Sequence, residues 1–309
     1  MSFLRNITGF LQDPPPEYVF EVSEGGIAYL RPGSSREVGF EPLKDDVLSI
    51  SPLRDNILRP EEFAVRVNAA AGPSTKKRRR AVLILPDFSA RVAVLDFDNF
   101  PEKPEEQMSL VRFRMKKGVP FDIDDAALSY YAQNTGKGKI ELVVAAVALE
   151  IIARYEAPFR AAGLHTGVVT LSSLATAELE KNNGITLLAK LSGRALTVSV
   201  FRDSVVRLVR CVELPEMTAD EVMAVVFPTI AFIEDELAAK PDRLTLCGFD
   251  GLQDARMDEL AQRWQAEFGV PVGQLRSPFG TPGQFNSGIL GYLESLYPSG
   301  RSRAEAVPA

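Results

Sequence analysis

The side chains best able to do chemistry in this sequence are carboxylates. Asp96 and Asp98 flank one phenylalanine, and paired acids of this kind hold a divalent cation in some transferases. They end a predicted strand, however, and no phosphate-binding glycine loop adjoins them. Asp122, Asp124 and Asp125 follow a Val-Pro-Phe segment and have the pattern of turn and cap residues. We therefore expect no metal site at either group.

Motifs for nucleophilic or phosphate chemistry are equally scarce. The chain contains neither a Gly-x-Ser-x-Gly elbow nor a Gly-x-x-x-x-Gly-Lys-Ser/Thr loop. Cys247 has no histidine near it in the sequence, which favours a buried apolar role over a nucleophile. The single histidine, His165, is interpreted as a turn or packing residue. Gly248 follows a predicted strand, where α/β folds often meet a nucleotide, but glycines there usually serve only as turns.

Composition narrows the classes of function further. The 309 residues include 35 Lys and Arg against 41 Asp and Glu, and this net charge of -6 argues against nucleic-acid binding by the whole chain. Two cysteines and one histidine cannot build a metal knuckle or a disulfide framework. The composition is typical of a cytosolic protein, and no apolar run reaches the roughly 20 residues that a spanning helix needs.

The N-terminal segment 1–17 carries apolar residues at helical spacing and ends in three prolines. It is interpreted either as an element that packs on its own domain or as a docking helix for a membrane surface or a partner. The basic run at 76–80 leaves a similar choice between a solvated loop and contact with acidic lipid or an acidic partner.

Hydrophobic periodicity and turn residues predict an alternation of strands and helices. In the first part of the chain, strands are expected at 18–22, 26–31, 38–40, 47–50 and 81–85, with a helix from Pro60 to Gly72. A compact module of strand, helix, strand and strand then follows, at 91–97, 105–117, 127–133 and 139–147, before a helix from Leu149 that Gly163 ends.

The second part begins with a strand at 167–171 and a helix, capped by Ser172 or Ser173, that extends to Lys181. A three-stranded meander is expected at 185–191, 195–201 and 205–213. Thr218 opens a capping box for a long helix, and the remaining predicted elements are a strand at 244–246, a helix at 254–268, a strand at 270–275 and a helix at 289–296. The tail from residue 298 is polar and is expected to be flexible.

Several of these segments together resemble the PilM family of type IV pilus assembly proteins, which is related to the cell-division protein FtsA. The most specific match is residues 119–130, VPFDIDDAALSY, which resembles that family's iPfpleevsldy segment. Residues 83–87, LILPD, resemble its lalPd strand end, and residues 244–248 with 269–272 resemble its late lsGG and Lgipv stretch.

The resemblance implies an actin-like α/β fold of two lobes around a nucleotide cleft, with an inserted strand-helix-strand-strand subdomain. We accordingly expect five units along the chain. They are an N-terminal segment 1–17, the first part of the first lobe at 18–80, an inserted subdomain at 81–165, a second lobe with the return to the first lobe at 166–297, and a flexible tail at 298–309.

The sequence motifs that bind the nucleotide in that family are only partly matched in this chain. The first phosphate turn, which should read Asp-Ile-Gly-Ser-Ser-Ser, is matched by residues 21–26 and places Glu24 where a phosphate would lie, and a carboxylate repels that anion. The second phosphate turn, which should read Asp-Ile-Gly, is matched by residues 190–193, which contain no acid that could bind magnesium. The adenosine turn, which should read Gly-Gly, is Gly248-Phe249 here. Lys190 could still neutralise a phosphate. By resemblance, the residues of this vestigial cleft are Gly25, Gly26, Lys190, Ser192, Gly193 and Gly248.

These departures favour a non-enzymatic scaffold of type IV pilus or type II secretion assembly, cytoplasmic and attached to the inner membrane through partners. By resemblance, it should bind the cytoplasmic tail of a PilN-like protein in a groove formed with the inserted subdomain, where Arg112, Arg114 and Lys116 are candidates for a basic rim. A solvated helix face explains these charges equally well. We expect no catalytic residue, metal ligand or cofactor, with ATP and magnesium as the alternative cofactors. The alternative functions are a working actin-like ATPase whose nucleotide state gates assembly, and an FtsA-like filament protein.

Overall fold

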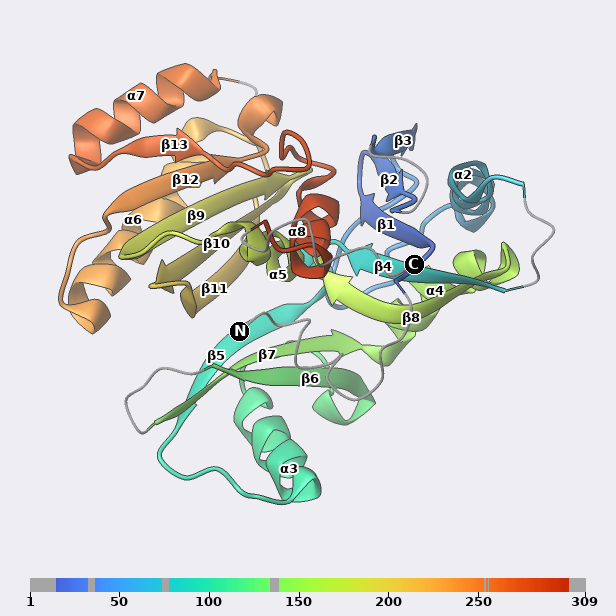
Figure 1. The fold of residues 1–309 in the computed structure, drawn as a ribbon, viewed down its shortest axis with the longest axis horizontal. Coiled ribbons are helices and arrows are strands. Elements are labelled where there is room, and N and C mark those ends of the chain that lie inside the picture. Colours follow the sequence, from blue (N-terminus) through green and yellow to red (C-terminus); the bar gives the residue numbers. More distant parts are fainter. Residues whose placement is uncertain are drawn as a thin grey trace.

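Two five-stranded sheets and one three-stranded sheet form the protein in a computed structural model, which is drawn in Figure 1. The structure describes residues 15–32, 37–73, 78–133, 139–252, 254 and 256–299. Most of the N-terminal segment 1–17, part of the basic run 76–80 and most of the tail 298–309 lie outside these residues, so the hypotheses about them stay predictions.

The first sheet has the strand order β3-β2-β1-β4-β8. Its strands are β1 (Tyr18–Ser23), β2 (Gly26–Leu30), β3 (Gly39–Pro42), β4 (Arg79–Leu85) and β8 (Leu164–Leu171). Helices α2 (Pro60–Ala71) and α4 (Leu149–Ala161) cover one face, whereas α5 (Ser172–Thr176) and α8 (Ser287–Leu296) cover the other. Because both faces are covered by helices, the central strands β1 and β4, which pair in parallel, are buried along almost their whole length.

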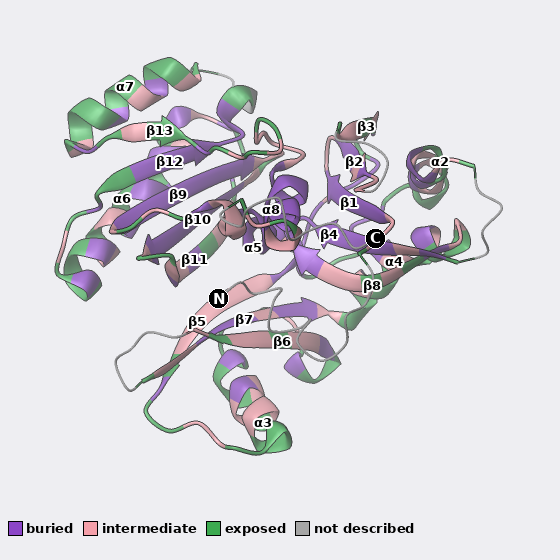
Figure 2. Ribbon diagram, viewed as in Figure 1, coloured by how far each residue is buried: buried purple, intermediate pink, exposed green. Residues whose placement is uncertain are grey.

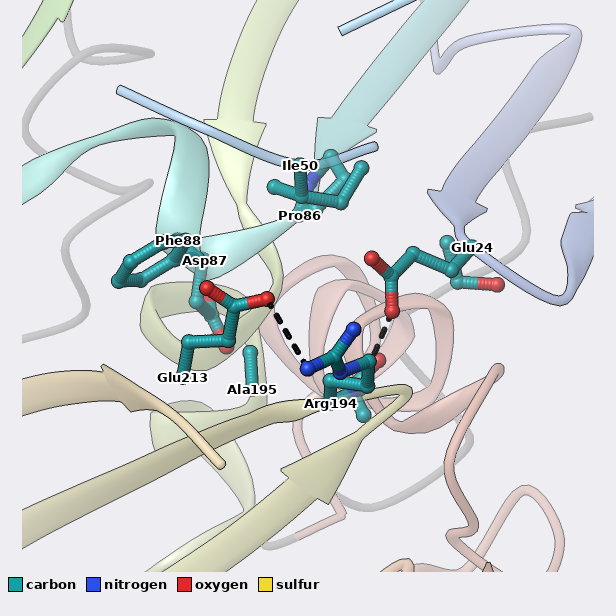
Figure 3. A pocket seen from close by; sticks show the side chains of 10 residues that line it. Glu24, Ile50, Pro86, Asp87, Phe88, Arg194, Ala195 and Glu213 are labelled. Atoms are coloured by element: carbon teal, nitrogen blue, oxygen red, sulfur yellow. Dashed lines mark hydrogen bonds and ion pairs between the residues drawn. The ribbon is translucent and has the colours of Figure 1, made fainter. Parts of the chain in front are cut away.

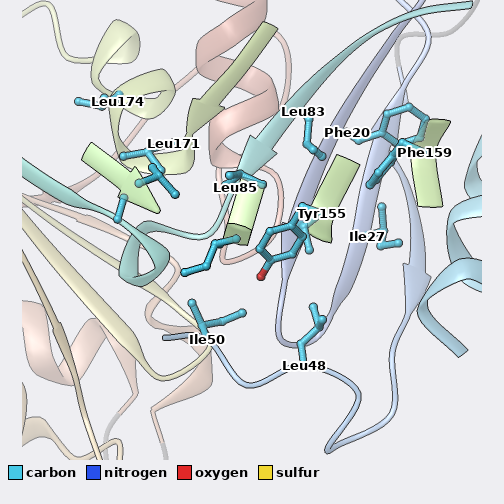
Figure 4. Close-up of a cluster of buried hydrophobic side chains, with 14 of the residues drawn as sticks. Phe20, Ile27, Leu48, Ile50, Leu83, Leu85, Tyr155, Phe159, Leu171 and Leu174 are labelled. Atoms are coloured by element: carbon cyan, nitrogen blue, oxygen red, sulfur yellow. The ribbon is translucent and has the colours of Figure 1, made fainter. Parts of the chain in front are cut away.

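Alternation along the strands divides the first lobe into two cores. Phe20 and Leu83 point toward α2 and α4, where they pack with Phe63, Tyr155 and Phe159 (Figure 4). Their neighbours in the sequence point the opposite way, toward α8. This period of two follows from the pleat of the strand and fixes the register of β1 against β4.

The second sheet has the order β11-β10-β9-β12-β13. Its strands are β9 (Ile185–Ser192), β10 (Ala195–Arg202), β11 (Val205–Glu213), β12 (Arg243–Cys247) and β13 (Val272–Gln274). Helices α6 (Ala219–Leu237) and α7 (Met257–Phe268) pack on one face around Trp264. Figure 2 shows β9 and β12 in purple, because nearly all of their residues are buried.

The small sheet has the order β5-β7-β6 and carries helix α3 (Pro104–Met115) on one face. Its strands are β5 (Arg91–Phe97), β6 (Ala126–Gln133) and β7 (Ile140–Ala148). This arrangement confirms the predicted strand-helix-strand-strand module. Strand pairing joins β4 and β8 to the first sheet, however, so the two strands that flank the module belong to the first lobe.

Three local expectations differ from the structure. Residues 47–50 form one bridge, Leu48 to Ile57, in place of a strand. The helix expected to reach Lys181 is only the five-residue α5 followed by a 3-10 turn, and its N-cap is Leu171 rather than a serine. Arg79, expected in a solvated basic run, is buried in β4 and donates to the carbonyl oxygens of Ala71 and Ala162.

None of the helices in the described ranges combines the length and the apolar character that crossing a membrane requires.

Candidate functional site

The two turns that resemble phosphate loops face each other across the junction of the lobes (Figure 3). The β1–β2 turn of the first sheet contains Glu24, and the β9–β10 turn of the second sheet contains Gly193 and Arg194. The amide N–H of Arg194 donates to the Glu24 carboxylate over 3.1 Å. A Cβ atom on Gly193, which has a φ of 55°, would lie 2.6 Å from the same carboxylate oxygen. The carboxylate thus lies directly against the second turn.

Almost no free volume remains between these turns. A cavity of about 10 Å³ is lined by Glu24, Asp87 and Ser192, with Arg194 and Glu213 at its side. That volume holds about one water molecule, whereas sites for drug-sized ligands and cofactors measure roughly 300–1,000 Å³. The gap between these two turns is therefore too small for a nucleotide in this conformation.

The expected adenosine turn is covered by the chain itself. Gly248 has a φ of 78°, and a Cβ atom there would lie 3.0 Å from the Cα of Gln284. The hydroxyl of Ser192 donates to the carbonyl oxygen of Gln284 over 2.9 Å. The neighbouring Phe285 stacks on Phe40 at 5.2 Å between ring centroids. No sequence motif marked this segment, because its role depends on contacts with residues far away in the chain.

The expected cleft residues are placed in different surroundings. Ser192 and Gly193 lie at the second turn, and Gly248 lies beside them against Leu191. Gly25 lies under the ring of Phe285, and Gly26 lies against Phe40 in the first sheet. Of the four glycines, only Gly193 lies against the Glu24 carboxylate, and the role of the others in a nucleotide cleft stays a prediction.

Lys190 does not offer its charge to that gap. Its ammonium lies 2.9 Å from the Asp87 carboxylate, and the side chains are only 2% and 3% exposed. The expectation that Lys190 is available to a phosphate is therefore corrected: a buried cation needs a fixed partner, and this one already has it. Burial acts to lower the pKa of Lys190, but the carboxylates of Asp87 and Glu21 outweigh it and raise that pKa.

Asp87 joins elements of both lobes. Besides Lys190 on β9, its carboxylate accepts the N–H of Ser173 at 2.6 Å and the hydroxyl of Thr197 on β10 at 3.1 Å. Asp87 itself follows β4 of the first sheet. One buried carboxylate thus links the end of β4, the start of α5 and two strands of the second sheet. The sequence signal for this link was Lys190, a single charged residue in a mostly apolar strand. A charge that is buried with such a strand needs a counter-charge beside it.

Glu21 occupies the position of the acid in the expected first phosphate turn. Its carboxylate accepts the N–H of Ile289, in the first turn of α8, at 2.9 Å and also accepts the hydroxyl of Ser172. It therefore caps a helix N-terminus, where a negative charge is favourable. Burial raises the pKa of Glu21 above its ordinary value, although Lys190 and these hydrogen bonds oppose the shift. Fully buried and already bonded, it does not fit the role of a magnesium ligand.

The remaining candidate residues, Asp96, Asp98 and Cys247, also have surroundings that explain them without a ligand. The carboxylates of Asp96 and Asp98 face the ammonium of Lys139 at 3.9 and 3.3 Å. Burial raises the pKa of the Cys247 thiol to about 11, so it is protonated at neutral pH. In the part of the chain that the structure describes, no group of three or more His, Cys, Asp or Glu side chains could hold a metal ion.

The expected basic rim on α3 is mostly used within the small subdomain. Arg112 donates to the carbonyl oxygen of Ile123. The guanidinium of Arg114 lies 3.7 Å from Asp96 and 5.1 Å from the centroid of the Phe97 ring. Lys116 is exposed. Arg112 and Arg114 therefore have contacts within the small subdomain, but their side chains are still 32% and 41% exposed, and their role as a basic rim stays a prediction.

A larger groove lies where the first lobe meets the small subdomain. It has a volume of about 420 Å³ and is bounded by the loop 52–55, by residues 121–125 and by the start of α4. Its apolar lining includes Leu53 and Leu149, which are 60% and 52% exposed. Its charged lining consists of four carboxylates and two guanidinium groups, from Asp55, Asp122, Asp125, Glu150, Arg54 and Arg154.

Comparison with solved structures identifies the fold. A chain of the PilM–PilN type IV pilus biogenesis complex superposes with a TM-score of 0.68 at 14% identity, covering 93% of this chain and 100% of that one. A Bacteroides thetaiotaomicron protein with an actin-like ATPase fold and unknown function gives 0.52 at 12% identity, covering 84% and 91%. The protein has an actin-like fold. Its likeness to the PilM–PilN chain confirms the resemblance read from the sequence, at the level of the fold.

A third solved structure is the cytoplasmic domain of EpsL, an inner membrane component of the type II secretion system of Vibrio cholerae. It matches with a TM-score of 0.48 at 11% identity and covers 90% of this chain and 94% of that one. No protein-family model matches the actin-like chain, and no curated protein does.

Proposed function

We propose that this actin-like protein is a non-enzymatic scaffold of type IV pilus or type II secretion assembly. It binds the cytoplasmic tail of a PilN-like inner-membrane protein and is held at the cytoplasmic face of that membrane by its partners. The observation that carries the non-enzymatic part is the closed cleft, where the Glu24 carboxylate contacts the Arg194 amide and about 10 Å³ remains. Supporting the partner is the likeness to a chain that is solved as a PilM–PilN complex.

The groove between the first lobe and the small subdomain is the proposed docking site. An extended peptide binds through backbone hydrogen bonds and a few side-chain pockets, and the exposed Leu53 and Leu149 offer apolar contacts for it. Four carboxylates against two guanidinium groups give the lining an acidic balance, although Arg154 is already paired with Asp55. We therefore propose a tail that combines apolar anchors with at least one basic residue.

The pairing of the strands supports a division of the chain into two lobes and a small subdomain. We propose a first lobe built on the β1–β4–β8 sheet, a small subdomain over residues 91–148 and a second lobe from β9 to β13, with α8 returning to the first lobe.

A working ATPase that gates assembly would need the two turns to separate. A filament protein would need contacts between copies of the chain, and no observation favours it over the scaffold.

Substitution of glutamate for Leu149 tests the groove. The probe is a fluorescent peptide with the sequence of the cytoplasmic tail of a PilN-like protein. We expect Leu149→Glu to weaken the affinity at least tenfold, because a central apolar contact is worth about 2 kcal/mol or more. Affinity is read from fluorescence anisotropy.

Val65→Glu is the matched control, since Val65 is also a helical apolar residue, 63% exposed, but lies outside the groove. Its affinity should equal that of the wild type. Equal binding by Leu149→Glu and the wild type would remove the groove from the account. An Arg112→Glu variant that alone lost binding would move the docking site to α3.

A further inference from the structure

The β9–β10 turn has the form of an anion site. Gly193 adopts a left-handed conformation, and the next residue directs its amide N–H into the cleft. Successive turn amides with this geometry form concave sites that bind phosphates and carboxylates. In this protein, the oxygen that accepts from the amide belongs to Glu24, 170 positions earlier in the chain.

This contact connects the two lobes. Glu24 lies in the β1–β2 turn of the first sheet, and Arg194 lies in the β9–β10 turn of the second. Glu213 also lines the cavity, but its carboxylate faces the Arg194 guanidinium at 3.7 Å from a neighbouring strand of the same sheet. Of these two acids, only Glu24 reaches from one lobe to the other (Figure 3).

We propose that the Glu24 carboxylate is a built-in anionic ligand, which occupies the anion site of the second turn and holds the cleft closed without a nucleotide. This inference rests on the proposed function and explains how a scaffold keeps its lobes together. It differs from simple repulsion of phosphate, because the carboxylate supplies the contact that an external anion would otherwise make.

Removal of the carboxylate should then expose a latent site. The Glu24→Ala variant keeps the Gly193 turn and frees both the Arg194 amide and the space next to it. Inorganic pyrophosphate is the probe, because it carries phosphate oxygens but no base or ribose. A nucleoside would also need space at the adenosine turn, where Gln284 lies against Gly248. Glu213→Ala is the matched control, since it removes the same charge from the same cavity.

Two readouts are measured on the full chain. Hydrogen–deuterium exchange of the segment 193–196 should become about tenfold faster in Glu24→Ala, because a hydrogen bond to a charged group is lost, and should stay unchanged in Glu213→Ala. Pyrophosphate at 10 mM should raise the melting temperature of Glu24→Ala and restore slow exchange. The wild type and Glu213→Ala should show neither response.

Each result has a defined meaning. Unchanged exchange in Glu24→Ala, or no response of that variant to pyrophosphate, would overturn the inference. An equal pyrophosphate response in the wild type or in Glu213→Ala would also overturn it, because the site would then not be occupied by Glu24. The proposed scaffold function is judged separately, by binding of the partner peptide to the wild type.

Discussion

Replacement of Lys190 by methionine should lower the free energy of unfolding by about 3–5 kcal/mol, the cost of leaving one member of a buried ion pair without its partner. The variant keeps the length of the side chain but leaves the Asp87 carboxylate without its counter-charge. The remaining donors to that carboxylate, from Ser173 and Thr197, are neutral. Urea denaturation followed by circular dichroism measures the loss.

An exposed ion pair supplies the control for this prediction. Arg263 lies 3.5 Å from Asp220, and their side chains are 56% and 86% exposed. Arg263→Met should therefore cost less than about 1 kcal/mol. The double variant Lys190→Met/Asp87→Asn should be less destabilised than the sum of its single variants, because it leaves no unpaired charge within the Lys190–Asp87 pair. Similar losses for Lys190→Met and Arg263→Met would contradict the buried ion pair of Lys190 with Asp87.

Substitution of alanine for Gly291 should destabilise the protein by about 3 kcal/mol, at the upper end of the usual cost of overpacking. Gly291 lies in α8 where that helix crosses α5, and a Cβ atom would be 2.6 Å from the carbonyl carbon of Ala175 and 2.9 Å from the Cα of Thr176. Both neighbours are backbone atoms, so the helices themselves must separate. Differential scanning calorimetry measures the change.

Gly273→Ala is the corresponding control, because no atom lies within 4 Å of its added Cβ and its φ is not positive. We expect its stability to stay within about 0.5 kcal/mol of the wild type. A Gly291→Ala protein as stable as Gly273→Ala would show that α5 and α8 do not pack closely, and the capping of α8 by Glu21 would need revision.

Much of the fold could be predicted from local patterns. The meander from β9 to β11 follows from its tight turns, which hold residues that tolerate positive φ, as Gly193, Asp203 and Ser204 do here. Thr218 was recognised as a cap, and its hydroxyl accepts the N–H of Glu221. Each of these features depends on residues close together in the sequence.

The failures occur where a distant contact decides the structure. The helix after Ser172 stops after five residues, and α5 is buried against α8, more than a hundred positions later. The candidate site shows the same limit. The sequence places Glu24 at a phosphate turn but cannot show that it contacts Arg194. It suggests a phosphate as the partner of Lys190, because the actual partner, Asp87, lies 103 positions away in the chain.

The account implies a division of roles within an actin-like fold. The cleft that could hold a nucleotide is closed by the chain's own carboxylate, while the groove beside the small subdomain keeps exposed apolar residues. The closed cleft is the feature that distinguishes the proposed scaffold from a working ATPase.

Isothermal titration of the purified protein with magnesium-ATP tests whether the cleft is closed to nucleotide. A cavity of about 10 Å³ between the turns predicts no binding heat at millimolar nucleotide, and partner peptide should bind equally with and without ATP. Saturable binding with a dissociation constant in the micromolar range would contradict the account, since the lobes would then open readily and the nucleotide-gated ATPase would become the better explanation.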